Sequence, residues 1–268
     1  MKKLYLGFLQ LIILACVTAQ DFESSQKDVS STSFPFDNIG EELEYSLKWG
    51  FLKVGSGYLR VFPVTSIDGE ECYHVQLQVE SNSVADSFYK VRNRFDSYIS
   101  KTKLLPVKYL ISQHEGDTHR EAEVVFNWND KTVVYQREGE EEKEPVEIQT
   151  ETWDPLSVVY SFRKVLDLTE KTTVLPTTDG KKFLMIDVEY LGLEDLETQL
   201  GNFNSIKIQP NTKELKGVFQ KSKKSKITMW YSNDQNRYPL LIKSKVIVGS
   251  FNAELKKIRS LVFSDSEG

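Results

Sequence analysis

The sequence predicts a mainly β protein: a large antiparallel sheet curled into a barrel or half-barrel, with one principal α-helix, at about residues 154–168, packed on it or in it. Three observations predict this class. Apolar and polar residues alternate with the period of a strand over most of the chain. Turn signals such as Asp68-Gly69 recur at hairpin spacing. A single segment shows helical periodicity, and its apolar face needs a sheet to pack against.

About a dozen strands are expected along the folded part of the chain. The alternating stretches lie at 42–49, 58–63, 73–79, 94–99, 107–114, 121–128, 132–136, 173–176, 182–191, 206–210, 227–232, 239–248 and 251–262. Between the third and fourth, residues 81–92 predict a short helix or irregular turn, with Ser83 as its cap. The acidic run 138–144 is expected to be a solvated loop.

The helix prediction rests on Asp154-Pro155-Leu156-Ser157. The Asp154 carboxylate can accept N–H groups of the first turn, and Pro155 suits the first helical position because it has no N–H to leave unpaired. The apolar residues that follow recur at steps of three and four. We expect this face to seal the β structure or to wall a cavity: Val159, Phe162, Val165 and Leu166. The charged residues are expected to point to water: Arg163, Lys164 and Asp167.

The first 19 residues have the pattern of an export signal. Lys2 and Lys3 precede an apolar run that is too short to span a bilayer, and Val17-Thr18-Ala19 forms a small-residue cleavage site. The alternative is a lipoprotein signal, in which Cys16 is acylated after Ile13-Leu14-Ala15. Both interpretations place the protein outside the cytoplasm, in the periplasm, with an outer-membrane anchor if Cys16 is acylated.

The rest of the chain predicts one β-rich domain. Residues 20–39 are expected to be a flexible leader, 40–263 a single domain and 264–268 a flexible tail. Without Lys2 and Lys3 the 34 basic residues become 32 against 39 acidic ones, a formal charge of −7. An acidic domain argues against nucleic-acid binding. After residue 19 the sequence has no apolar run long enough to predict a transmembrane span. The oligomeric state stays open.

Candidate catalytic and metal-binding residues are few. His114 and His119 flank one turn and are weak metal candidates, since zinc needs three or four ligands at tetrahedral geometry. With cleavage after Ala19, Cys72 is the one remaining cysteine and is expected to be a small strand residue. No nucleophile elbow or phosphate loop is present. The sequence therefore indicates a protein without catalytic activity and without a cofactor.

The aromatic residues are the more informative candidates. In a curled sheet, inward side chains can leave a cavity for an apolar ligand, or they can fill the interior. The weak candidates for ligand contacts are Trp49, Trp128, Trp153, Phe162 and Trp230. The basic run Lys213–Lys226 leaves two interpretations open: a patch for anionic lipid or polysaccharide, or lysines that protect a strand edge.

Four stretches in this order resemble a known family. They are Gly40 to Gly50 with Val54-Gly55, Trp153 to Tyr160, Met229 to Asp234 leading to Tyr238-Pro239-Leu240, and Val248 to Leu255. Together they resemble a bacterial exported family known only as a domain of unknown function, number thirty-one-zero-eight, over about residues 40–258. The resemblance implies a periplasmic or outer-membrane-associated β-rich protein and supplies no catalytic residues. Its motif residues are interpreted as architecture: Gly50 and Gly55 for a turn, Asp154 and Pro155 for a helix start, Pro239 and Gly249 for strand ends.

Three functions follow as expectations. The first is a cell-envelope protein that binds an apolar or amphipathic ligand, such as a lipid or lipid-linked glycan, in its β framework. The second is a non-catalytic structural or assembly factor that acts through protein contacts at the envelope. The third, a hydrolase that uses Cys72, His114 or His119, lacks the usual triad and metal spacings.

Overall fold

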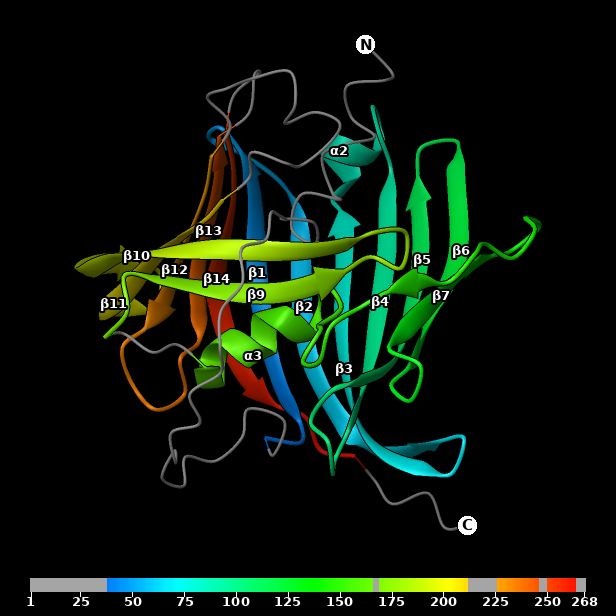
Figure 1. The fold of residues 1–268 in the computed structure, drawn as a ribbon. Coiled ribbons are helices and arrows are strands. Elements are labelled where there is room, and N and C mark those ends of the chain that lie inside the picture. Colours follow the sequence, from blue (N-terminus) through cyan, green and yellow to red (C-terminus); the bar gives the residue numbers. More distant parts are fainter. Residues whose placement is uncertain (1–37, 166–168, 212–225, 246–249, 264–268) are drawn as a thin grey trace.

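The chain folds into one curled antiparallel sheet around a helix. The computed structural model describes residues 38–165, 169–211, 226–245 and 250–263. In this part of the chain, 14 strands form one sheet in the order β8-β7-β6-β5-β4-β3-β2-β1-β14-β13-β12-β11-β10-β9. Neighbours are consecutive in sequence except where β1 pairs with β14, so the chain winds outward in both directions from this central pair (Figure 1). The predicted fold class is confirmed.

The strands and helices have the following bounds. They are β1 Glu41–Trp49, β2 Leu52–Ile67, β3 Glu70–Ser81, α2 Ser83–Asp86, β4 Val91–Ser100, β5 Pro106–Glu115, β6 Thr118–Asn127, β7 Thr132–Arg137, β8 Val146–Glu147, α3 Ser157–Val165, β9 Thr172–Thr178, β10 Phe183–Thr198, β11 Gly201–Pro210, β12 Lys226–Ser232, β13 Pro239–Lys245 and β14 Ser250–Ser260.

The alternation of the sequence sets which face of each strand turns inward. On β1, Leu43, Tyr45 and Leu47 are at most 4% exposed and belong to the apolar core. Side chains alternate across a strand, so their neighbours on β1 turn to the outer face. The turn between β2 and β3 has φ of 50° at Asp68 and 86° at Gly69, which a two-residue hairpin turn requires at both central positions.

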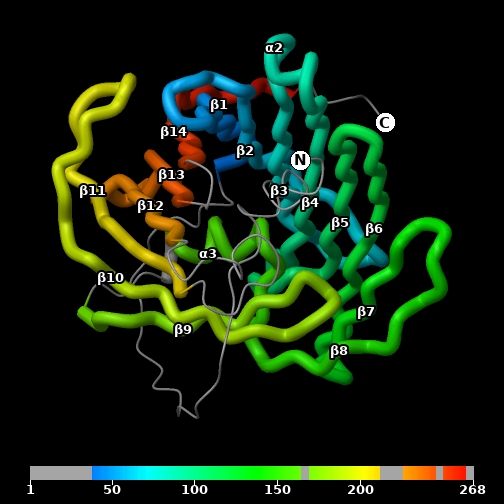
Figure 2. The backbone as a smooth tube through the Cα atoms, turned by 90° about the horizontal axis from the view of Figure 1, so that it is seen from above, coloured from blue at the N-terminus to red at the C-terminus, as the bar shows by residue number. Residues whose placement is uncertain are grey.

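The two outer ends of the sheet approach each other (Figure 2). Trp153, which follows β8, accepts a hydrogen bond from Thr178 N and donates one to Pro176 O, both at 2.9 Å and both on β9. The turn after β9 reaches the opposite wall. There a Cβ on Gly180 would come within 2.7 Å of Val124 Cγ2 and 3.1 Å of Tyr135 Cβ. The segment around Trp153 therefore bridges the gap between the two edges of the sheet.

Helix α3 lies inside this curve. It has β9 and β10 on one side and β1, β2 and β14 on the other (Figures 1 and 2). The helix expected at about 154–168 is present as α3: Asp154 caps it as predicted, and its first residue is Ser157. The expectation that Arg163 points to water was wrong: it is 4% exposed, since the sheet surrounds the helix. Lys164 and Val165 have no described side chains, and 166–168 lie outside the described residues.

Two smaller expectations also change. The short helix α2 is capped by Asn82, whose side chain accepts from Ala85 N, and not by Ser83. Gly55 lies inside β2 rather than in a turn. A glycine is needed there because β2 and β3 pass so closely that a Cβ would lie 2.2 Å from Glu80 O. Gly50 does form the predicted turn, and Pro239 begins β13.

Several predicted features lie outside the described residues. They are the signal segment 1–19 with Cys16, most of the leader 20–39, all but the last residue of the basic run 213–226, Gly249 and the tail 264–268. Within the described ranges, no helix combines the length and apolar character that crossing a bilayer requires.

Candidate functional site

The cap of α3 is buried at the centre of the molecule. Asp154 is 0% exposed, and its Oδ1 accepts hydrogen bonds from Leu156 N at 2.8 Å and Ser157 N at 2.9 Å. Its Oδ2 accepts from Ser97 Oγ on β4 at 2.5 Å. Burial raises the pKa of Asp154, and the hydrogen bonds from Ser97, Ser157 and Leu156 oppose that rise. The cap thus fixes the start of the helix against the sheet.

The other end of α3 is held by a buried ion pair. The Arg163 guanidinium donates to both carboxylate oxygens of Glu41 on β1, at 2.6 and 2.9 Å, and to Asn236 O at 2.9 Å. The two side chains are 1% and 5% exposed. Burial acts to lower the pKa of Arg163, but the hydrogen bonds and charge of Glu41 outweigh it and the pKa is raised. This pair fixes the helix to the central strand.

A small apolar pocket lies beside the start of α3. Its volume is about 30 Å³, it is partly open, and all of its exposed lining is apolar. The turn before α3 contributes Pro155 and Leu156, and the helix contributes Val159. The sheet contributes residues from β1, β2, β3, β13 and β14. Gly57 on β2 leaves room at this wall, because a Cβ there would meet Leu47 Cδ2 at an ordinary 3.7 Å.

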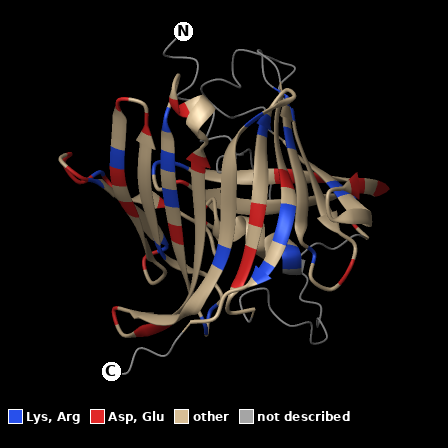
Figure 3. Ribbon diagram, turned by 180° about the vertical axis from the view of Figure 1, so that it is seen from behind, with Lys and Arg blue, Asp and Glu red and all other residues tan. Residues whose placement is uncertain are grey.

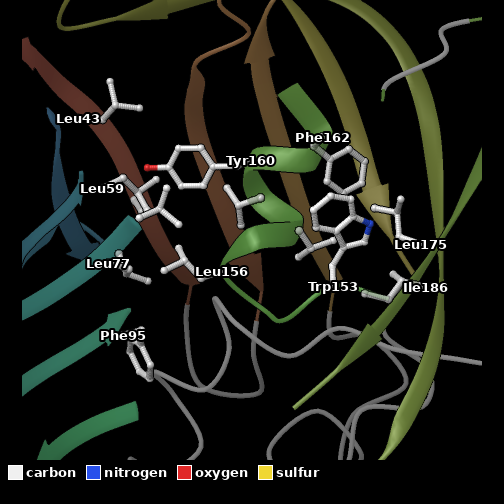
Figure 4. Packing of buried hydrophobic residues seen from close by; sticks show 14 of the residues in the cluster. Leu43, Leu59, Leu77, Phe95, Trp153, Leu156, Tyr160, Phe162, Leu175 and Ile186 are labelled. Carbon is white, nitrogen blue, oxygen red and sulfur yellow. The ribbon is translucent and has the colours of Figure 1, made fainter. Parts of the chain in front are cut away.

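The five aromatic candidates do not converge on one cavity. Trp153 and Phe162 lie together on the side of α3 that faces Leu175 and Ile186, where they fill the core (Figure 4). Trp230 packs beneath Lys207 and Lys243, each 5.2 Å from its ring. Trp128 donates to Pro106 O at 2.7 Å at a strand end, and Trp49 ends β1.

The histidine and cysteine candidates lie apart. His114 and His119 face each other across one hairpin, with ring centres 4.8 Å apart, and His114 Nε2 lies 2.8 Å from Glu121 Oε1. Cys72 pairs with Ser100 while His114 pairs with Arg92, so they lie at opposite ends of β4. Burial raises the pKa of the Cys72 thiol to about 11. Over the described residues, no group of three or more His, Cys, Asp and Glu could hold a metal ion.

On the outer face of the sheet, a row of polar side chains crosses five strands. Arg259, Glu42, Arg60, Gln76 and Asp96 occupy paired positions on β14, β1, β2, β3 and β4. Glu42 accepts from both arginines at 2.6 Å. Burial acts to raise its pKa, but these hydrogen bonds hold the pKa below its usual range. Figure 3 shows acidic and basic residues interspersed over this face, and the paired row stabilises the sheet rather than forming a binding site.

The sequence did not single out Glu41, Arg163 or Gly57 as site residues. The alternation of charge along 41–48 resembles any strand with one solvated face. Arg163 follows a helical pattern whose polar positions usually face water. Gly57 carried a signal, because a glycine inside a strand often marks a close approach of other groups.

Comparisons with known proteins identify one matching family and several structures that align with this chain. Residues 44–256 match the model of a family described as "Protein of unknown function (DUF3108)". None of the curated proteins matches the sequence. A crystal structure from Brucella abortus, described as a β-barrel-like protein of domain of unknown function DUF1849, is similar in fold. Its TM-score is 0.56 at 8% identity, over 84% of this chain and 98% of the other.

Two further structures align with lower scores. A candidate exported protein with a YmcC-like fold from Bacteroides fragilis has a TM-score of 0.34 at 10% identity, over 83% of this chain and 96% of that one. A candidate lipoprotein from Parabacteroides distasonis has a TM-score of 0.35 at 8% identity, over 86% and 100%.

Proposed function

The chain belongs to the family of proteins of unknown function DUF3108, and we propose that it is an exported protein of the cell envelope that binds an apolar or amphipathic ligand and catalyses no reaction. The ligand class is a lipid or lipid-linked glycan. Export is supported by the basic start, apolar run and cleavage signature of residues 2–19. The binding site is the apolar pocket between α3 and the β1–β3 wall.

One observation carries the proposal. In the interior of a strand-rich protein, a pocket whose exposed lining is wholly apolar lies beside the one long helix of the described chain. Apolar lining favours an alkyl chain over water, because a water molecule needs two to four polar partners there. The space holds roughly one or two methylene groups as it stands. A longer chain enters by displacing the side chains of Leu156 and Val159 from the sheet.

The Gly57→Val variant tests this proposal. Valine suits a strand, its Cβ meets no atom closer than 3.7 Å, and its two methyl groups project into the pocket. We expect binding of dodecan-1-ol to weaken by about tenfold or more, because the methyl groups occupy the volume that the alkyl chain needs. Isothermal titration calorimetry on the full-length chain measures the change.

Ser56→Val is the matched control. Ser56 neighbours Gly57 on the same strand and points to the other face, so the added methyl groups stay outside the pocket. Binding of dodecan-1-ol should be the same in this variant as in the wild type. The proposal fails if the wild type does not bind the alcohol, or if both variants lose binding equally.

A second candidate function, an assembly factor that acts through protein contacts, is favoured by an exposed apolar patch. The patch consists of Phe51 and Leu52 in the β1–β2 turn and Val84 and Phe88 at α2, which are 92%, 59%, 70% and 88% exposed. The two segments are neighbours, because Asn82 N donates to Val54 O at 2.9 Å. Large exposed apolar side chains that gather in one place mark contact surfaces.

The double variant Phe51→Ser/Phe88→Ser tests this second candidate. We expect it to lose the envelope proteins that crosslink to the wild type in the native cells, because its two most exposed aromatic side chains are gone. Val262→Ser, which removes a 95% exposed apolar side chain outside the patch, should keep them. Identical crosslinking patterns for all three proteins would rule out the patch as a protein-binding surface.

A further inference from the structure

The inner wall of β5–β7 carries buried hydroxyl groups without partners. Ser97, Tyr109, Val124 and Tyr135 occupy one row across β4, β5, β6 and β7. Both tyrosines are 1% exposed. Their hydroxyl oxygens are buried and have no hydrogen-bond partner in the part of the chain that the structure describes. Most buried hydroxyl groups are paired, because leaving one unpaired costs about 1–3 kcal/mol.

Arg120 on β6 adds a partly buried guanidinium to the same wall. Its Nε is buried and has no acceptor among the described residues. Its charge acts on both phenols. Burial raises the pKa of Tyr109 and of Tyr135, the charge of Asp154 adds to the rise for Tyr109, and Arg120 opposes the rise in each. Arg163 differs from Arg120 in this respect, because its Nε donates to Asn236 O and its other two nitrogens donate to Glu41. A buried N–H group that lacks an acceptor is unfavourable unless something supplies one.

The nearby carboxylates have other partners. Glu115 accepts from Asn93 at 2.7 Å and from Gln113 at 3.4 Å. Burial raises the pKa of Glu115, and the charge of Arg120 opposes that rise, but no hydrogen bond joins the two side chains. Asp154 accepts from Ser97 and the helix cap, as described above. Asp179 accepts from the N–H groups of the two residues that follow it, at 3.0 and 3.2 Å.

Further cations increase the excess of positive charge around Tyr135. Lys181 Nζ lies 4.3 Å from the centre of its ring and Lys143 Nζ lies 5.6 Å from it. Arg137 and Lys143 both pair with Glu140, at 2.7 and 3.8 Å. The Tyr135 region therefore combines unused donors with cations, and the unused donors belong to Arg120, Tyr109 and Tyr135.

We propose that Arg120, Tyr109 and Tyr135 bind an anionic group, a carboxylate or phosphate, that forms the polar end of the ligand. The inference rests on the proposed function and defines its ligand as an anionic amphiphile. Tyr109 lies beside Ser97, which donates to Asp154, and Asp154 is followed directly by two pocket residues, Pro155 and Leu156. The anion site and the apolar pocket thus lie on two sides of one turn, as a ligand with a charged end and an alkyl chain requires.

The test compares dodecanoate and dodecyl phosphate with the neutral dodecan-1-ol. We expect the wild type to bind both anions more tightly than the alcohol. In Arg120→Leu, affinity for the anions should fall by about tenfold to a hundredfold, the size of a charged hydrogen bond, while affinity for the alcohol stays the same. Arg120→Lys, which keeps the charge, should retain part of the anion binding. Arg137→Leu is the matched control and should leave all three affinities unchanged.

Stability separates a binding role from a structural one. In the ligand-free protein, the midpoint of thermal unfolding of Arg120→Leu and Tyr135→Phe should stay the same or rise, because each change removes an unpaired polar group. A structural arginine would give the opposite result. Inorganic phosphate at constant ionic strength should raise the midpoint of the wild type and not that of Arg120→Leu.

The outcomes distinguish this inference from the proposed function. Equal binding of the anions and the alcohol, with no effect of Arg120→Leu, overturns the anion site and leaves the apolar pocket intact. No binding of any alkyl probe, with stabilisation by phosphate that depends on Arg120, overturns the apolar pocket and supports the anion site. No response to any probe, or a large loss of stability in Arg120→Leu, overturns the anion site.

Discussion

Glu41→Ala lowers the free energy of unfolding by about 3–5 kcal/mol, the largest effect that we expect from a single substitution in this protein. The variant leaves the Arg163 guanidinium, whose side chain is 1% exposed, without the carboxylate that accepts two of its hydrogen bonds. An uncompensated charge in the interior costs far more than a lost surface pair. Urea unfolding, followed by tryptophan fluorescence, measures the difference.

Two comparison variants make this result specific. The double variant Glu41→Leu/Arg163→Met should recover most of the lost stability, since an apolar pair of similar volume often replaces a buried ion pair without cost. Glu254→Ala removes a partner of Lys48 in a pair that is 30% and 19% exposed, and should cost about 1 kcal/mol or less. If Glu41→Ala costs no more than Glu254→Ala, the pair does not hold the helix to β1.

Asp154→Ala is expected to lower the free energy of unfolding by about 2–4 kcal/mol. Loss of a helix cap costs about 0.5–2 kcal/mol, and the buried Ser97 hydroxyl loses its acceptor, which costs about 1–3 kcal/mol. Asp154→Asn keeps an oxygen that can accept the N–H groups of Leu156 and Ser157, so its loss at neutral pH should be smaller. Equal losses in the two variants would contradict the capping role.

The same pair of proteins, wild type and Asp154→Asn, gives a pH dependence with a definite sign. Because burial raises the pKa of Asp154 in the folded state, the native protein binds more protons than the unfolded chain between the two pKa values. Wild-type stability from this group therefore falls as pH rises from about 3.9, the unfolded pKa, through the higher folded pKa. The stability of Asp154→Asn relative to the wild type should rise over that window, as measured by urea unfolding at each pH. A difference that stays flat would contradict the raised pKa.

Local sequence signals predicted the strands and the helix start well. The alternation over 42–49 correctly predicted which side chains of β1 point inward, and Asp68-Gly69 correctly predicted the turn after β2. Asp154 indicated the cap of α3, which begins at Ser157 rather than at Pro155. Each of these signals depends on residues within a few positions of one another, where propensity and hydrogen bonding are local.

The site residues could not be identified from the sequence, because their roles depend on contacts between segments far apart in the chain. Trp230 was a ligand candidate because it is a large aromatic residue, and its strand places it against Lys207 and Lys243 instead. Arg120 and Tyr135 looked like ordinary strand residues, and only the pairing of β5, β6 and β7 brings them to one inner wall. The residue pattern of one strand does not predict which side chains on the neighbouring strands lack a hydrogen-bond partner.

The sequence by itself determined the mainly β class, one principal helix with its cap at Asp154 and the membership of a family of unknown function. Only the tertiary structure decided that Arg163 is buried against Glu41, that a small apolar pocket lies beside the start of the helix, and that the Nε of Arg120 is buried without an acceptor among the described residues. The physical reason is that burial and pairing are set by the closing of the sheet around α3. That closing depends on contacts such as Trp153 with Thr178, whose strength no local pattern encodes.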